Sequence, residues 1–191
     1  MKNTPHSSPH KAPAPVSLID AVKDGDLVAV RNLLNQGSDV NEADSDGDSA
    51  LSCAARLDYT DIARLLIEKG APIDSRNIDG DTPLMAVIYS YGSSFGGYYS
   101  QKKEDIIRLL LEKGASLDLK NNDGATALNL AKDRHLTTVV KILKETAEKR
   151  ERLAAKLAAQ HAEDKRRALV AQKQQRLRDL AKHKPKPPKA A

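Results

Sequence analysis

The strongest constraint on the fold is a short segment that the sequence repeats three times. It reads Gly47-Asp48-Ser49-Ala50-Leu51, then Gly80-Asp81-Thr82-Pro83-Leu84, then Gly124-Ala125-Thr126-Ala127-Leu128. Successive segments begin 33 and 44 residues apart, and a second set of glycines keeps the same intervals: Gly37, Gly70 and Gly114. A fixed period of this length is typical of a repeat protein whose units pack only on their neighbours. The sequence therefore predicts a stack of similar units, one of which carries an 11-residue insertion.

Each unit contains signals for a short helix followed by a longer one. Ser49, Thr82 and Thr126 stand where a side-chain oxygen can cap the first amides of a helix, and Pro83 suits the first helical position. Apolar residues at helical spacing then predict longer helices that include 61–67, 105–111 and 138–143. Gly70 and Gly114 follow the first two of these longer helices, at the position where helices end in a left-handed conformation.

This arrangement resembles the ankyrin repeat, whose pattern runs Gly-x-Thr-Pro-Leu-His-x-Ala and ends its second helix with Leu-Leu-Leu-x-x-Gly. The resemblance covers about residues 17–145, includes a partial first unit at 25–37, and is most specific at 82–84 and 108–114. It implies an all-α solenoid of four helix-turn-helix units joined by hairpin-like loops. The histidine of the pattern is replaced in this chain by Ser52, Met85 and Asn129, so its hydrogen bonds are expected to be absent or altered.

Composition and charge divide the chain into four parts. We expect a disordered segment at 1–16, the ankyrin domain at 17–145 with its insertion at about 90–101, a basic helix at 146–181, and a Lys/Pro-rich tail at 182–191. Residues 1–140 carry 15 Lys and Arg against 20 Asp and Glu, a net charge of −5. Residues 141–191 carry 16 Lys and Arg against 6 Asp and Glu, a net charge of +10. The body is therefore acidic and the C-terminal part basic.

The long C-terminal helix is predicted from the absence of Gly and Pro between Ala125 and Lys184. Good helix formers dominate there, and the helix is expected to run from about 136 to 181. Its apolar stripe begins as a cap on the repeats and fails at Asp164 and Arg167, where a coiled coil needs apolar residues. A second, shorter stripe is expected to bind a partner, and it consists of Leu169, Val170, Leu177 and Leu180.

Two candidate binding surfaces follow from the resemblance and from composition. In ankyrin folds the hairpin tips and short helices line a concave binding surface, which here contains Asp44, Asp46, Asp48, Arg76, Asn77, Ile78, Asp79, Asp81, Met85, Lys120 and Asn121. The alternative is a solvated charged rim. The insertion sets aromatic rings among Gly and Ser, a composition typical of recognition loops. Its rings are Tyr89, Tyr91, Phe95, Tyr98 and Tyr99, and the alternative is that they fold back on adjacent helices.

Catalytic, metal and cofactor sites are not expected. A calcium loop beginning at Asp44 would need Gly at its sixth position and Glu at its twelfth, but Gly47 is fourth and Ala55 twelfth. His135 occupies a turn position of the repeat, with no nucleophile placed to use it. The glycines of the insertion are not followed by the Lys and Ser or Thr of a phosphate-binding loop.

The sequence thus predicts a non-enzymatic protein–protein interaction module of the adaptor, inhibitor or neutraliser type. Another protein is expected to bind the concave surface, the insertion or both, and the chain is expected to be a monomer. Two alternatives remain: nucleic-acid association through the basic helix and tail, and a structural spacer. No apolar run is long enough to span a membrane, and the N-terminus lacks a signal-peptide core. A cytoplasmic location is therefore expected, or a periplasmic or secreted one if a signal peptide was removed.

Overall fold

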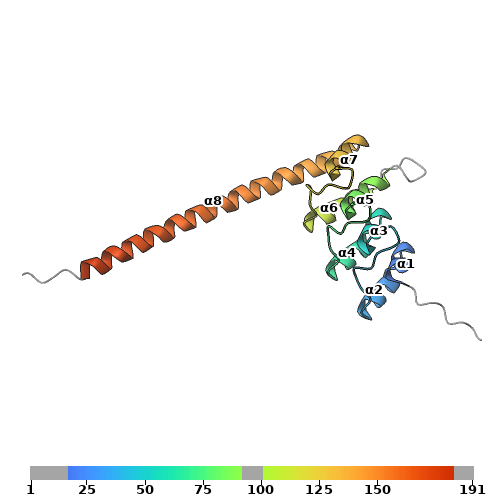
Figure 1. The fold of residues 1–191 in the computed structure, drawn as a ribbon, viewed down its shortest axis with the longest axis horizontal. Helices are drawn as coiled ribbons and strands as arrows, with labels where there is room; N and C mark the ends of the chain where they lie inside the picture. The colour runs from blue at the N-terminus through green and yellow to red at the C-terminus, as the bar shows by residue number, and fades with distance from the viewer. Residues whose placement is uncertain (1–16, 92–100, 183–191) are drawn as a thin grey trace, which may run out of the picture. The chain divides into compact units, whose positions relative to one another are not determined.

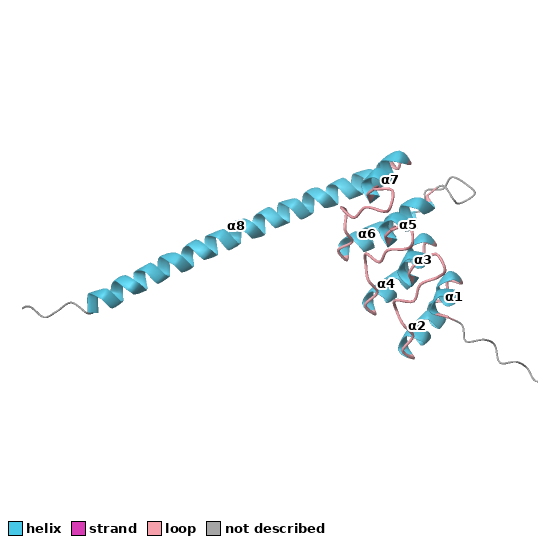
Figure 2. Ribbon diagram, in the orientation of Figure 1, coloured by secondary structure: helices cyan, strands magenta, loops and turns pink. Residues whose placement is uncertain are grey.

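The computed structural model describes residues 17–91 and 101–182, and the chain divides into two units, Met1–Lys144 and Glu145–Ala191 (Figure 1). Each unit is considered by itself. The N-terminal segment, the end of the tail and three of the predicted binding residues, Phe95, Tyr98 and Tyr99, lie outside the described residues. Eight helices and no strand are found within the described ranges (Figure 2).

The helices form four consecutive pairs, as the repeat pattern predicts. They are α1 (Leu18–Lys23), α2 (Leu27–Asn35), α3 (Ala50–Arg56), α4 (Thr60–Glu68), α5 (Pro83–Ser90), α6 (Gln101–Glu112), α7 (Ala127–Asp133) and α8 (Thr137–Lys182). In the first unit the pairs α1/α2, α3/α4 and α5/α6 stack in chain order, and α7 follows them (Figure 1). The prediction of an all-α stack followed by a long C-terminal helix is confirmed.

The predicted helix caps are present in all three repeated segments. Ser49 accepts a hydrogen bond from the amide three residues later at 3.2 Å, and Thr82 and Thr126 do the same at 3.4 and 3.3 Å. Pro83 occupies the first turn of α5. Each cap satisfies an amide that the helix itself cannot pair, which fixes where each short helix begins.

Apolar side chains from both helices of each pair form one continuous core. Cys53 on α3, Leu66 on α4, Leu84 on α5 and Leu110 on α6 are fully buried. Helix α5 contacts α3, α6 and α7, so its side chains lie between the preceding and following units. The start of α8 belongs to the same core through Val139, Ile142 and Leu143.

The loops between successive units end in three hairpin tips: the first at 44–48, the second at 77–81 and the third at 121–125. The tips require glycine where consecutive tips touch. Gly80 has a φ of 76°, in the left-handed region, and a Cβ on it would lie 3.1 Å from the Asn122 nitrogen and 2.5 Å from the Arg76 guanidinium. Gly47, with a φ of 75°, would place its Cβ 3.1 Å from the Ile78 nitrogen. These glycines therefore serve both the turn and the stacking of the tips.

The second unit contains the distal part of α8, whose described side chains from 151 to 179 are all exposed. Local pairs between side chains four residues apart join Glu148 to Arg152 at 3.5 Å and Glu163 to Arg167 at 2.6 Å. Such pairs add to the high helix propensity of this sequence. Across residues 17–91 and 101–182, none of the helices has the length and apolar character needed to cross a membrane.

Candidate functional site

Three side chains at matching positions of successive hairpin loops hold the tips in shape. Asp44, Asn77 and Asn121 each use a side-chain oxygen to accept the amide of the residue four positions later, at 3.0, 2.9 and 2.9 Å. They are 33 and 44 residues apart, the intervals of the repeat. The same local hydrogen bond therefore closes every tip, in the manner typical of Asp and Asn in turns.

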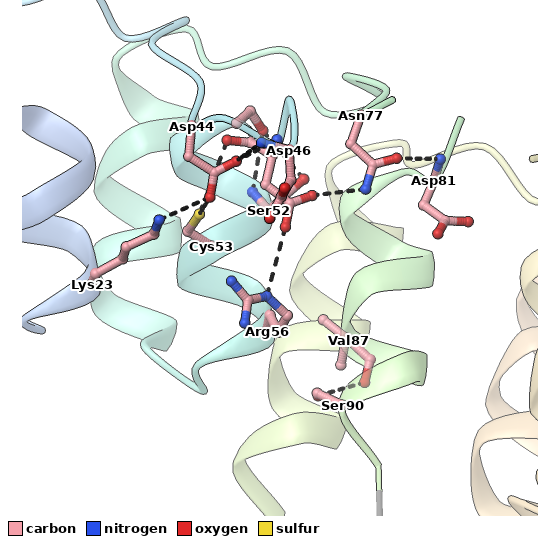
Figure 3. Close-up of polar contacts among 12 residues, drawn as sticks. Lys23, Asp44, Asp46, Ser52, Cys53, Arg56, Asn77, Asp81, Val87 and Ser90 are labelled. Carbon is pink, nitrogen blue, oxygen red and sulfur yellow. Dashed lines mark hydrogen bonds and ion pairs between the residues drawn. The ribbon is translucent and has the colours of Figure 1, made fainter. Parts of the chain in front are cut away.

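The two asparagines also connect each tip to the one before it. The Asn77 side-chain amide donates to the Asp48 carboxylate at 2.9 Å, and the Asn121 amide donates to the Asp81 carboxylate at 3.0 Å. The Asn121 amide also lies 3.2 Å from the Tyr89 hydroxyl. In Figure 3 the Asn77 amide points toward the loop that carries Asp44, and its oxygen accepts from the Asp81 amide of its own loop. These side chains hold the tips together rather than facing solvent.

Backbone hydrogen bonds strengthen the same connections. The Ile78 amide donates to the Asp46 carbonyl at 3.1 Å, and the Asn122 amide donates to the Asp79 carbonyl at 2.9 Å. The Asn122 side chain also donates to the Ile78 carbonyl at 2.9 Å. The backbone of the second tip is therefore bonded on both sides, which gives a rigid base for the side chains it carries.

Two buried carboxylates in this network have opposite pKa shifts. Burial acts to raise the pKa of Asp44, but the Lys23 ammonium at 2.9 Å and two backbone amides outweigh it, so the pKa lies below its usual range (Figure 3). Burial raises the pKa of Asp81, whose hydrogen-bond donor is the neutral amide of Asn121. The difference follows from the partners: a cation and two backbone amides together favour the charged form of Asp44, whereas the Asn121 amide lowers the pKa of Asp81 by less than burial raises it.

Asp44, Asp48 and Cys53 form an acidic cluster with ligand atoms within 4.8 Å of one another. Cations of the protein lie against both carboxylates: Lys23 at 2.9 Å from Asp44 and Arg56 at 3.7 Å from Asp48. Burial, together with these two carboxylates, raises the pKa of the Cys53 thiol to about 11. A thiol with this pKa stays protonated at neutral pH and is a poor metal ligand. The cluster is therefore explained as part of the fold.

The predicted concave-surface residues separate into an exposed and a structural group. The exposed side chains, which we call the tip face, are Asp46, Arg76, Ile78, Asp79 and Lys120. The structural group is held in the network described above and contains Asp44, Asp48, Asn77, Asp81 and Asn121. Met85 is 1% exposed because α5 lies between neighbouring units, so it belongs to the core and is removed from the predicted surface.

The base of the insertion is held by two cations that the sequence did not reveal. Lys103 is buried, and its ammonium lies 2.8 Å from the Ser90 hydroxyl and 3.0 Å from the Asp58 carboxylate. Arg134 donates to the backbone carbonyls of residues 89 and 91, both at 3.2 Å. The two residues in each contact are more than twelve positions apart, and their separation is not the repeat interval. No sequence pattern therefore indicated these contacts.

The two described tyrosines of the predicted recognition loop pack at this base. The Arg134 guanidinium lies 4.9 Å from the centre of the Tyr89 ring, and Tyr89 is half-buried. Tyr91 is buried in the core cluster, with the Lys103 ammonium 5.7 Å from its ring centre. Within the described residues, these rings therefore support the stem of the insertion more than they present a surface.

Comparison with known proteins agrees with this architecture. The family described as "Ankyrin repeats (3 copies)" matches residues 18–95, and the family described as "Ankyrin repeat" matches residues 79–122. With four stacked helix pairs and hairpin tips at the repeat interval, the chain belongs to the ankyrin repeat family.

Several curated proteins are similar over part of their length. "Protein phosphatase 1 regulatory subunit 27" of Mus musculus is 42% identical over 67 residues, which are 35% of this chain and 44% of that protein. "Ankyrin repeat and SOCS box protein 6" of Homo sapiens is 36% identical over 77 residues, which are 37% of this chain and 18% of that protein. "M-phase phosphoprotein 8" of Rattus norvegicus is 41% identical over 70 residues, which are 36% of this chain and 8% of that protein. The matches span less than half of each relative. The repeats and these relatives indicate protein–protein interaction by a non-enzymatic module.

Proposed function

We propose that this protein is an adaptor-type module that binds a protein partner at the tip face. The observation that carries the proposal is Ile78, a large apolar side chain that is 66% exposed at the second tip. The backbone on which it stands is bonded to the first tip through Asp46 and to the third through Asn122. An apolar residue on a rigid loop is a feature typical of recognition sites.

The rigidity of the tip makes Ile78 a good anchor for a partner. Binding must overcome the entropy lost when interface groups become ordered, and a loop already fixed by hydrogen bonds loses little. Interfaces draw most of their energy from a few central side chains that a partner desolvates completely. Ile78 can supply such a contact, whereas the inward-turned side chains of Asn77 and Asp81 cannot.

The charges around Ile78 fit the rim of an interface. Asp46 and Asp79 are negative, Arg76 and Lys120 are positive, and all four are exposed. A polar rim around an apolar centre is the usual arrangement of a protein interface, and the rim sets orientation and specificity. We therefore expect the partner to present an apolar pocket edged by charges of both signs. The name of one relative, a phosphatase regulatory subunit, supports a role exerted through a bound protein.

A matched pair of substitutions tests this proposal. Ile78→Asp places a charge at the anchor, and Val28→Asp does the same on α2, where Val28 is equally exposed at 68%. Tagged intact protein and both variants would be expressed in the native cells, and co-purified proteins quantified by mass spectrometry. We expect at least one partner to fall about tenfold or more with Ile78→Asp, a loss of about 1.4 kcal/mol, and to be retained by Val28→Asp. Equal recovery from all three, with unchanged circular dichroism, would rule out the tip face.

A further inference from the structure

The distal part of α8 contains two stretches of different charge. Residues 145–164 carry four Lys and Arg against five Asp and Glu, a net charge of −1. Residues 165–179, which we call the basic segment, carry six Lys and Arg against one Asp, a net charge of +5. The six cations are Lys165, Arg166, Arg167, Lys173, Arg176 and Arg178, and all are exposed. The positive charge of this helix is therefore concentrated near its C-terminal end.

Local pairing neutralises this segment only in part, through Arg167, which lies 2.6 Å from Glu163 in the stretch before it. Glu148 lies 3.5 Å from Arg152, one turn along the helix. In contrast, Lys165, Lys173 and Arg178 have no acidic residue three or four positions away in the sequence. Those spacings are the ones at which helical side chains meet. The basic segment therefore carries an excess of positive charge that an anionic partner can use.

The cations are spread over more than half of the helix circumference instead of forming one narrow stripe. Successive residues of an α-helix point about 100° apart, so the consecutive side chains of 165–167 already cover more than half of its circumference. The exposed Leu169 and Leu177 have Lys173 midway between them, one turn from each. A helix that lies on a membrane needs an uninterrupted apolar side, and a coiled coil needs an apolar seam. The distribution instead fits a partner that offers negative charge on several sides of the helix.

We propose that the basic segment of α8 binds duplex DNA by lying in the major groove and contacting the phosphates of both walls. That groove is about 12 Å wide and admits an α-helix. The segment of 15 residues is about 22 Å long, and duplex DNA carries one negative charge per about 1.7 Å of axis, more than enough for six cations. The interaction is independent of sequence because phosphate contacts carry no base information.

Other nucleic acids fit the segment less well. Proteins that bind single strands stack bases on aromatic side chains, and residues 165–179 contain no aromatic residue. The major groove of duplex RNA is deep and too narrow for side chains to read. We therefore expect duplex DNA to bind more tightly than duplex RNA of the same length. This site lies in the second unit and does not depend on the tip face.

The test measures fluorescence anisotropy of a labelled 24-base-pair DNA duplex with the full chain between 50 and 200 mM salt. Six phosphate contacts predict a slope of about −5 for the logarithm of the binding constant against the logarithm of salt concentration. A variant with Lys173, Arg176 and Arg178 changed to Gln should roughly halve this slope and weaken binding about tenfold or more at 100 mM salt. Glutamine is a good helix former, so circular dichroism should not change.

A matched control removes the same charge from the neighbouring stretch by changing Lys149, Arg152 and Lys156 to Gln. The last of these lies about 13 Å from Lys165 along the helix, beyond the screening length of about 8 Å at physiological salt. We expect this variant to bind within about threefold of the intact chain. The proposal is overturned by any of four results: no duplex binding at 50 mM salt, equal weakening by both variants, tighter binding to duplex RNA, or binding to phosphatidylserine-containing vesicles without binding to DNA.

Discussion

The repeat stack and the distal part of α8 are both helical, but different forces hold them. In the stack Leu66, Leu84 and Leu110 are fully buried, while in the distal helix Leu153 and Leu177 are 65% and 59% exposed. The stack helices are short, and helices of that length are not stable alone in water. They form because packing against neighbours stabilises them. The distal helix depends instead on residue propensity and on pairs one turn apart.

The largest expected effect comes from making the same Leu→Ala substitution in both regions. Leu110→Ala leaves a cavity in the stack, and we expect it to lower the free energy of unfolding by about 2–5 kcal/mol. Leu153→Ala, on an exposed helix surface, should change it by no more than about 0.5 kcal/mol. Urea unfolding followed by circular dichroism measures both. A similar effect of the two substitutions would contradict the contrast.

A smaller effect tests how the tips hold the stack together. Gly80→Ala forces a non-glycine residue into the left-handed region, which costs about 1–2 kcal/mol, and it also presses a Cβ against the third tip. Gly37→Ala has the same backbone penalty at a φ of 93° but meets no atom within 4 Å. Gly80→Ala should therefore be the more destabilising of the two in urea unfolding. Equal losses would show that the contact between tips contributes nothing.

The ion pair between Lys23 and Asp44 should make the stack sensitive to acid. The pKa of Asp44 is lowered in the folded protein, so its contribution is present above the unfolded value of about 3.9 and is lost as pH falls through the folded pKa. Lys23→Met should lower the free energy of unfolding by up to about 1 kcal/mol at pH 7, because the pair is partly exposed. The difference between the two proteins should shrink as the pH falls below about 3.9 and through the folded pKa of Asp44.

The local pair of the distal helix provides the comparison for this measurement. Glu163→Gln removes the partner of Arg167 and should weaken only the helix around it, by about 0.2–0.5 kcal/mol. The unfolding of the stack, measured with a probe in the first unit, should not change. An effect of Glu163→Gln on the stack as large as that of Lys23→Met would mean that the two regions are not independently stabilised.

Much of the fold could be predicted from the sequence because the repeat interval and local chemistry agree. The caps at Ser49, Thr82 and Thr126 are found where they were expected, and the helix predicted from 136 to 181 runs from Thr137 to Lys182. Both kinds of signal act over a few residues or recur at a fixed interval. They can therefore be recognised without knowing which distant segments come together.

The direction of the tip side chains could not be predicted in the same way. The interval places Asn77 and Ile78 on the same tip, but only the packed structure shows that Asn77 turns inward and Ile78 outward. One signal was available: Asp44, Asn77 and Asn121 follow the repeat interval, which indicates a structural role. Lys103 offered no such signal, since its partner Asp58 lies 45 residues earlier and the insertion interrupts the repeat between them.

The smallest predicted effect concerns Asp81, whose pKa is raised where that of Asp44 is lowered. Burial is the main cause, so Asp81 favours folding while protonated, and this contribution is lost as pH rises through its folded pKa. Asp81→Asn keeps an oxygen for the Asn121 amide and removes the buried charge. It should therefore raise the free energy of unfolding at pH 7 by a few tenths of a kcal/mol, with no gain below pH 3. Thermal unfolding at both pH values decides this, and a loss of stability at pH 7 would show that the carboxylate charge itself holds the second and third tips together.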